Sequence, residues 1–336
     1  MQIRMWPHGW KKSGIRDGQE ETMRKRMLFL LIGSVSLLLF GCSSPRYARA
    51  QEDSSAPEQS ADAVVSPEQG TDLPAPSENG AHSSAASDVS QETDSQVQTG
   101  LIAEQILEGE TGTIHYSYYL PEGYSDETEY PMVVTMPGYD MMWFGEQSSG
   151  ANLNWEGFLC WTRLPEDFIV VSAQLTDWRE TSANQAIELT EYFLEHFSVD
   201  RARVYAAGYS AGGETMSQAV SMRPDLYAAY LHGASQWDGA YEPVAQNGTA
   251  VYIFMAEHDE YYGSERARMA YENLYDAYVQ AGWTQEDIDS VLQLQTPDDE
   301  WFASRGITEN YHGGGNVVFK EESVLNWVLS HRKQES

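Results

Sequence analysis

Hydrophobic positions after residue 101 gather in short runs rich in β-branched and aromatic side chains, and these runs alternate with stretches of helical spacing. The runs predict strands at 113–120, 132–136, 168–173, 203–207, 227–232 and 251–255. Residues 113–120 alternate as an outer strand does, whereas most of the others are continuous, as the buried strands of a parallel sheet are.

Helical spacing lies between and after these runs, at 183–197, 265–281 and 322–329. Alternating strands and helices are typical of an α/β fold in which helices flank a mostly parallel central sheet. We therefore predict a single α/β domain over residues 101–336.

The N-terminus has the features of a secretory signal. An apolar run of 14 residues, 27–40, follows the basic residues 24–26 and is shorter than the roughly 20 residues that a membrane-spanning helix needs. Because Met23 lies directly before the basic residues, residues 1–22 are interpreted as an over-called start or as an unusually long basic region of the signal.

The end of the apolar run, Leu39-Phe40-Gly41-Cys42, resembles the lipobox of bacterial lipoproteins. The resemblance implies that residues 1–42 form a signal peptide and that Cys42 is lipidated as the first mature residue. The protein is then held in the bacterial cell envelope by a membrane anchor. The alternative is a short signal anchor that is left uncleaved; both place the domain on the extracytoplasmic side.

Residues 43–100 are rich in Ser, Ala, Gln, Glu, Asp and Pro and show neither alternation nor helical spacing. Such a segment cannot bury enough apolar surface to offset its chain entropy. It predicts a disordered acidic tether between the anchor and the domain.

Charge and cysteine content narrow the function further. The net charge is −31, and residues 101–336 hold 11 basic and 38 acidic residues. This balance excludes nucleic-acid binding through a general basic surface and disfavours polyanionic substrates.

Lipidation of Cys42 leaves Cys160 alone, so no intramolecular disulfide is expected, and Cys160 is interpreted as a small buried hydrophobic residue. Without a H-E-x-x-H motif or cysteine pairs, we expect neither a metal site nor a cofactor.

The candidate chemistry lies where strand 203–207 runs into Gly208-Tyr209-Ser210-Ala211-Gly212, with a helix-compatible stretch following from Glu214. This is G-x-S-x-G between a strand and a helix, where small residues allow a tight turn that presents a serine hydroxyl above the sheet. The helix N-terminus then offers the N–H of Ala211 to an oxyanion. The alternative is a tight glycine turn without chemistry.

Residues 198–213 resemble the nucleophile region of the α/β-hydrolase superfamily, and more narrowly its secreted esterase and prolyl-oligopeptidase-like branch, with feruloyl esterases and polyhydroxybutyrate depolymerases. The resemblance is strong around Ser210 and thin elsewhere. It implies a triad in the order serine, acid, histidine, with the acid after the penultimate strand and the histidine before the last helix.

Those two positions hold Asp259 and His312. We expect His312 to act as general base toward Ser210 and then as general acid, and Asp259 to orient and stabilise the imidazolium. Glu257 and Glu260 remain alternatives for the acid. We expect four other histidines to have structural roles or to point elsewhere: His115, His232, His258 and His331.

The family takes a second oxyanion donor from the loop after an early strand, often an H-G-G-type motif. Here Met136-Pro137-Gly138-Tyr139 has the glycine but no preceding histidine, so the N–H of Tyr139, or that of an adjacent residue, is expected as the donor. The alternative is an ordinary Pro-Gly turn.

Many aromatic residues fall in predicted loops and offer rings that stack on sugar, aryl or acyl groups, or that cap the core. They are Trp143, Phe144, Trp155, Trp161, Trp178, Trp237, Tyr241, Tyr261, Tyr262 and Trp301. With few basic residues near the motifs, a neutral ester is favoured over a phosphate or sulfate ester. The sequence thus predicts an extracytoplasmic serine hydrolase of small or carbohydrate-linked carboxylic esters. The alternatives are a serine peptidase of the same fold and a catalytically silent binding lipoprotein.

Overall fold

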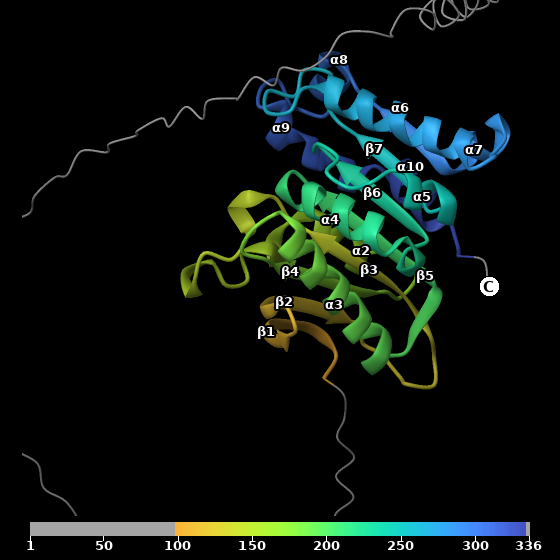
Figure 1. Ribbon diagram of the computed structural model, residues 1–336. Coiled ribbons are helices and arrows are strands. Elements are labelled where there is room, and N and C mark those ends of the chain that lie inside the picture. Colours follow the sequence, from red (N-terminus) through yellow and green to blue (C-terminus); the bar gives the residue numbers. More distant parts are fainter. Residues whose placement is uncertain (1–97, 334–336) are drawn as a thin grey trace, which may run out of the picture. The chain divides into compact units, whose positions relative to one another are not determined.

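An eight-stranded sheet runs through residues 98–333, the part of the chain that the computed structural model describes (Figure 1). The predicted signal, Cys42 and nearly all of the predicted tether lie outside the described residues. Along the sheet the strand order is β1-β2-β4-β3-β5-β6-β7-β8. The bounds are β1 Gly100–Gly109, β2 Gly112–Leu120, β3 Tyr130–Met136, β4 Ile169–Gln174, β5 Val199–Tyr209, β6 Ala229–Gly233, β7 Ala250–Phe254 and β8 Leu292–Gln295.

The strand pairing is mostly parallel. β1 and β2 form an antiparallel hairpin, β2 pairs antiparallel with β4, and every later neighbour in the sheet is parallel. In the central strands β3 and β4 every residue is buried, because helices cover both faces of the sheet. This explains why the sequence of these strands is continuously apolar.

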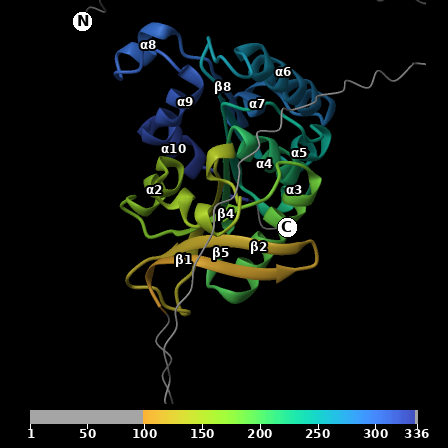
Figure 2. The same cartoon turned by 90° about the vertical axis from the view of Figure 1, so that its left-hand side faces the viewer.

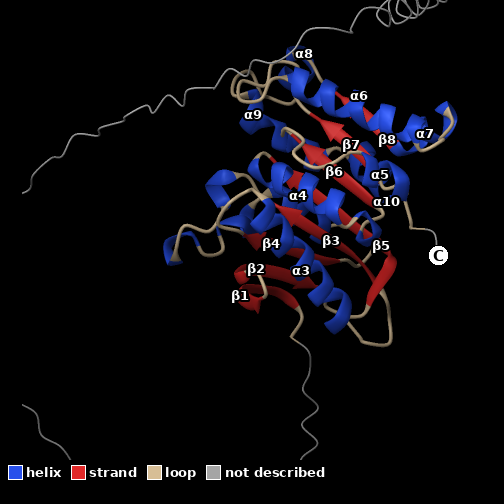
Figure 3. Ribbon diagram, viewed as in Figure 1, coloured by secondary structure: helices blue, strands red, loops and turns tan. Residues whose placement is uncertain are grey.

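Helices form a layer on each face of the sheet (Figures 2 and 3). One layer contains α2 Glu156–Thr162 and α10 Glu322–Leu329, and the other contains α3 Glu180–His196, α4 Ala211–Met222, α5 Glu242–Asn247 and α6 Ser264–Gln280. Three shorter helices lie toward the end of the sheet formed by β7 and β8 (Figure 1): α7 Gln285–Val291, α8 Asp299–Ala303 and α9 Tyr311–Gly314. Each face has its own hydrophobic core.

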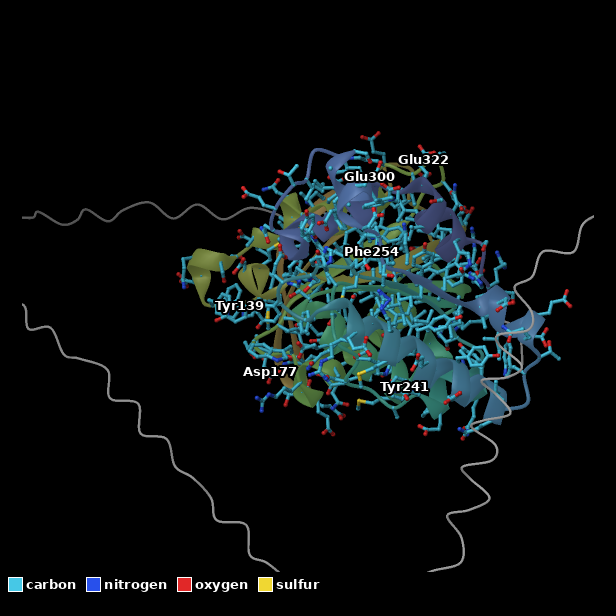
Figure 4. The ribbon with its side chains drawn as sticks, turned by 90° about the horizontal axis from the view of Figure 1, so that it is seen from above. Tyr139, Asp177, Tyr241, Phe254, Glu300 and Glu322 are labelled. Atoms are coloured by element: carbon cyan, nitrogen blue, oxygen red, sulfur yellow. The ribbon has the colours of Figure 1, made fainter. Side chains whose placement is uncertain are left out.

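The predicted α/β fold with a mostly parallel sheet is confirmed. All six predicted strands overlap strands of the structure, and the three predicted helices match α3, α6 and α10 to within three residues at each end. Phe254, at the end of β7, lies near the middle of the molecule in the view from above (Figure 4) and is fully buried.

Two edge strands were not predicted, and residues 113–120 are therefore not the outer strand. β1 pairs outside β2, and its register shifts between Ile102 and Gln105, where Glu104 has φ +57°. That irregularity breaks the period of two on which recognition of a strand depends. β8 has only four residues, too few for a periodic signal.

Within the described range, none of the helices has the length and apolar character needed to cross a membrane. Cys160 is buried as expected, and burial raises the pKa of its thiol well above the ordinary range, which makes it unreactive.

Candidate active site

Ser210 forms the turn between β5 and α4. Its backbone has φ +54° and ψ −125°, a combination that a side chain with a Cβ atom disfavours. Hydrogen bonds hold it there from both sides: the N–H of Ser210 donates to the carbonyl of Gly233 at 3.0 Å, and the carbonyl of Ser210 accepts from the N–H of Gly213 at 2.8 Å.

The glycines around Ser210 are required by close backbone approach. A Cβ atom on Gly212 would lie 2.2 Å from the carbonyl oxygen of Met136, and one on Gly208 would lie 2.5 Å from the carbonyl oxygen of Gly212. Both distances are impossible contacts with backbone. The G-x-S-x-G spacing therefore reflects the packing of the turn against β3.

Replacing Ser210 by glycine or by alanine tests the strain directly. Glycine adopts a positive φ without a Cβ penalty, whereas alanine keeps the penalty. We expect Ser210→Gly to be about 1 kcal/mol more stable than Ser210→Ala in urea unfolding. Equal stability of the two variants would contradict a strained turn.

Three side chains predicted from the sequence meet in a continuous chain of hydrogen bonds. The Oγ atom of Ser210 lies 3.0 Å from Nε2 of His312, and Nδ1 of His312 lies 2.8 Å from Oδ2 of Asp259. Because an ionised carboxylate only accepts, Nδ1 carries the proton and Nε2 is left to accept from Ser210. This is the arrangement that a general base for a serine needs.

Asp259 is buried, and its charge is satisfied. Its Oδ1 accepts the backbone N–H groups of Tyr261 at 3.0 Å and Tyr262 at 2.8 Å. Burial alone would raise the pKa of Asp259, but the hydrogen bonds from His312 and from these two N–H groups outweigh it and hold the pKa below its ordinary value. Asp259 thus stays ionised beside the imidazole at neutral pH.

The two alternative acids do not touch the imidazole. Glu257 is exposed. Glu260 accepts the backbone N–H groups of Tyr311 and His312, each at 2.9 Å, so it holds the main chain that carries the histidine. The sequence did not predict this role of Glu260. His312 itself lies in the short helix α9, where a loop was expected.

The remaining histidines have partners away from Ser210. His232 is fully buried between the hydroxyl of Tyr230 and the carbonyl of Ser235, and burial lowers its pKa to about 4. Of the other four, His258 pairs with Asp299 and His115 stacks on Trp143. His331 contacts the Ser290 carbonyl, and His196 contacts the Tyr192 carbonyl.

Both expected oxyanion donors lie beside Ser210. A Cβ atom on Gly138 would lie 3.4 Å from Cβ of Ser210, which places the peptide leading to Tyr139 against the nucleophile. Among the described residues, the N–H groups of Tyr139 and Ala211 have no hydrogen-bond acceptor. Two free N–H groups at the same cavity can stabilise a negatively charged oxygen.

A cavity of about 570 Å³ opens at Ser210. It is lined by Gly138, Tyr139, Asp140, Met141, Trp155, Trp178, Tyr209, Ser210, Ala211, Glu214, Tyr261, Tyr262, His312, Gly313 and Asn316. Among the aromatic residues of the predicted loops, Trp178, Tyr261 and Tyr262 reach the cavity, and Trp161 and Trp237 lie in the hydrophobic cores. Trp155 belongs to a core and also lines the cavity. Tyr139 lies on the same side of the molecule as Asp177 (Figure 4).

Glu214 and Tyr262 form a pair at the cavity wall that the sequence did not predict. The Tyr262 hydroxyl donates to Oε1 of Glu214, and both residues line the cavity together with Ser210. Burial raises the pKa of Glu214 to about 7, opposed by the hydrogen bond from Tyr262 and aided by the negative charge of Asp238. A glutamate one helical turn after the serine is the only signal in the sequence.

The raised pKa of Glu214 predicts a pH-dependent stability. Between about pH 4.5 and pH 7 the unfolded chain ionises this group while the folded protein keeps the proton, so stability falls as pH rises through this window. Glu214→Gln removes this effect. We expect the variant to gain about 2 kcal/mol relative to the parent between pH 4.5 and pH 7.5, measured by urea unfolding. A difference that does not change with pH would contradict the raised pKa.

Within residues 98–333, no group of three or more His, Cys, Asp or Glu side chains is arranged to hold a metal ion.

The chain is similar to a known protein family over part of its length and to solved structures of esterases. Residues 172–284 match the model of Peptidase_S9, the prolyl oligopeptidase family. Among curated proteins, none matches the chain. A solved structure of a thermostable esterase is 17% identical, with a TM-score of 0.57 over 69% of this chain and 63% of the esterase. This chain thus spans less than two thirds of that relative's length.

Two further solved structures are similar at lower scores. A mutant of the feruloyl esterase module from Clostridium thermocellum, complexed with sinapinate, is 13% identical, with a TM-score of 0.43 over 70% of this chain and 90% of the module. A ferulic acid esterase is 14% identical, with a TM-score of 0.44 over 66% of this chain and 99% of its own. The similarity to the thermostable esterase shows that this chain has the α/β-hydrolase fold. It carries the hydrogen-bonded serine, histidine and aspartate of a serine hydrolase and is similar to the prolyl oligopeptidase family over residues 172–284.

Proposed function

We propose that this protein is a serine hydrolase that cleaves carboxylic esters, small or carbohydrate-linked, through an acyl-enzyme formed on Ser210. The observation that carries the proposal is the chain of hydrogen bonds from Ser210 through His312 to Asp259, which opens onto a cavity with two free N–H groups. Nucleophile, base, orienting acid and oxyanion donors are the parts that acyl transfer needs.

In the first half of the reaction, Oγ of Ser210 attacks the ester carbonyl carbon while Nε2 of His312 takes the hydroxyl proton. The carbonyl oxygen becomes an oxyanion that accepts from the N–H groups of Ala211 and Tyr139. When the bond to the alcohol breaks, the imidazolium gives its proton to the leaving oxygen. Asp259 stabilises the imidazolium throughout without taking its proton.

In the second half, a water molecule takes the place of the alcohol. His312 removes a proton from the water, the hydroxide attacks the acyl carbon, and the ester bond to Ser210 breaks as the imidazolium returns the proton to Oγ. The acid is released and the free enzyme is restored. The same residues therefore serve both steps without a cofactor.

A serine peptidase is the second candidate, and the match of residues 172–284 to the prolyl oligopeptidase family favours it. Esters and peptides pass through the same acyl-enzyme and differ in the leaving group. Two substrates with the same acyl group distinguish an esterase from a peptidase. In one the acyl group is joined to ethanol as an ester, and in the other it is joined to an amino acid as the amide of a dipeptide. We expect turnover of the ester, with the acyl mass found on Ser210 after an acid quench. Turnover of the peptide alone would favour the peptidase, and turnover of neither would favour a silent binding protein.

We further propose that residues 1–42 are a lipoprotein signal, that Cys42 is lipidated, and that residues 43–100 tether a domain of residues 101–336 to the outside of the bacterial membrane. The basic, apolar and Gly-Cys sequence of the N-terminus supports this. Feeding an alkyne-labelled fatty acid to the expressing cells should label the parent chain and not Cys42→Ser. Equal labelling of both would contradict the anchor.

A further inference from the structure

The cavity beside Ser210 has exposed aromatic rings on its wall. Tyr139 meets Trp178 edge to face at 5.9 Å between ring centroids, and Tyr261 stacks on the ring of His312 at 5.2 Å. Tyr139 and Tyr261 are 52% and 74% exposed, so both rings are available to a ligand. Aromatic faces attract neutral rings and, more selectively, cations.

The charged residues on the same wall have one sign. Asp140 and Glu214 line the cavity, and within the described part of the chain no Lys or Arg does. The domain as a whole, with 38 acidic and 11 basic residues, adds a negative field around the entrance. A ligand with a positive charge is drawn to such a cavity, and one with a negative charge is repelled.

Glu214 is the most informative of these groups because it is only 6% exposed and has no cationic partner. No ion pair among residues 98–333 includes Glu214 or its acidic neighbour Asp238. The groups that face the Glu214 carboxyl are the Tyr262 hydroxyl, Gln236 and Asp238. Arg266 acts on Asp238 but does not line the cavity.

Asp200, another partly buried acid of this chain, is paired with arginine residues. Asp200 is held by Arg203 at 2.7 Å and by Arg332 at 3.2 Å, and although burial opposes it, these contacts lower its pKa. Glu214 has a like-charged neighbour in place of two arginines, and it faces a cavity. A buried carboxyl without a cation is costly, and a cationic ligand would relieve that cost.

We propose that the cavity takes an ester whose acyl group carries an ammonium group, and that Glu214 binds that ammonium. The proposal rests on the proposed function and names its substrate class. The N–H of Glu214 donates to the carbonyl of Ser210 at 3.1 Å, and both residues line the same cavity, so the carboxyl lies close to the nucleophile. The ammonium and the ester carbonyl are therefore close together in the substrate, as in a short amino acid ester.

The test compares two esters that differ only in charge. Ethyl 3-aminopropanoate and ethyl butanoate have similar shapes, and only the first carries an ammonium group at pH 7. The measured quantity is the ratio of their kcat/KM values. We expect Glu214→Gln to lower the ratio, ammonium over neutral, by at least about tenfold, because a hydrogen bond to a charged group is lost for one substrate alone.

The matched control is Glu272→Gln, the same chemical change on the exposed surface of α6. It removes one negative charge without touching the cavity, so the ratio should stay at the parent value. A ratio that is the same in the parent, Glu214→Gln and Glu272→Gln would overturn the proposal. A general effect of charge would lower the ratio equally in both variants and would overturn it too.

Binding to the full-length Ser210→Ala variant separates this proposal from the esterase function. Calorimetry with ethyl 3-aminopropanoate in two buffers of different ionisation enthalpy counts the protons released. We expect a net proton release near pH 7, because the bound ammonium favours the ionised form of Glu214. If the parent cleaves neither ester, the esterase function fails, and this measurement still decides the inference: binding with proton release supports it, and no binding overturns it. If Glu214→Gln does not fold, this calorimetric measurement on Ser210→Ala tests the inference in its place.

Discussion

Ser210→Ala is expected to lower kcat for ester hydrolysis by about 10⁴-fold or more, the largest effect on activity of any single change in this protein. The variant lacks the atom that forms the acyl-enzyme. The remaining activity is the direct attack of water on the ester, assisted by His312 and the free N–H groups. Stability should change by about 1 kcal/mol or less, because alanine occupies the same backbone conformation. Steady-state kinetics and urea unfolding of the same preparation measure both effects.

The control for this variant is Ser304→Ala. Ser304 lies at the end of α8, is exposed, and donates its hydroxyl to the carbonyl of Trp301. It should keep the activity of the parent. Turnover by Ser210→Ala above about one hundredth of the parent rate would show that another group is the nucleophile.

Gly212→Ala is expected to have the largest effect on stability, with a loss of about 3 kcal/mol in the free energy of unfolding. The added methyl group would lie 2.2 Å from the carbonyl oxygen of Met136 and 2.5 Å from that of Pro137, and both atoms belong to the backbone. The end of β3 and the start of α4 must therefore move apart. Such a movement shifts the N–H of Ala211 relative to Ser210, so kcat should also fall by about 10²-fold.

Gly123→Ala is the matched control for this prediction. A Cβ atom at Gly123 meets nothing within 4 Å, and its backbone does not require glycine. Its stability should lie within about 0.5 kcal/mol of the parent. Urea unfolding of the two variants side by side distinguishes a local clash from a general cost of losing glycine, and equal stabilities would contradict the close packing at Gly212.

The central part of the fold follows from the sequence because helices bury it on both faces. Continuous apolar runs such as β3 and β4 can pack only inside such a sheet, and the helical spacing of α3 and α6 shows which face each helix turns inward. The edge strands carry no such constraint. β1 contains an irregular register, and β8 is short, so neither has the regular alternation that marks a strand.

The candidate site was predictable where its residues directly follow parallel strands. Ser210 follows β5 and Asp259 follows β7, and the ends of parallel strands meet at the same edge of the sheet. His312 was expected from the family resemblance, and it lies within hydrogen-bonding distance of both.

The supporting contacts were not predictable because they join segments far apart in the chain without a motif. Glu260 holds the backbone of His312 across 52 positions, and Tyr262 reaches Glu214 across 48. In the sequence Glu260 is only an alternative for the triad acid, and Glu214 looks like any other acidic residue of a strongly acidic chain. Only the folded arrangement shows that Glu260 holds the backbone of the histidine and that Glu214 lines the cavity beside the nucleophile.

The most direct test of the central claim, that Ser210 is an activated nucleophile, is labelling of the full-length protein with a fluorophosphonate. Mass spectrometry of the digested protein then locates the adduct, with Ser210→Ala and heat-denatured protein as controls. The hydrogen-bonded chain predicts an adduct on Ser210 in the folded parent and none in either control. A folded parent that takes no label, or that takes it on another serine, would contradict the account.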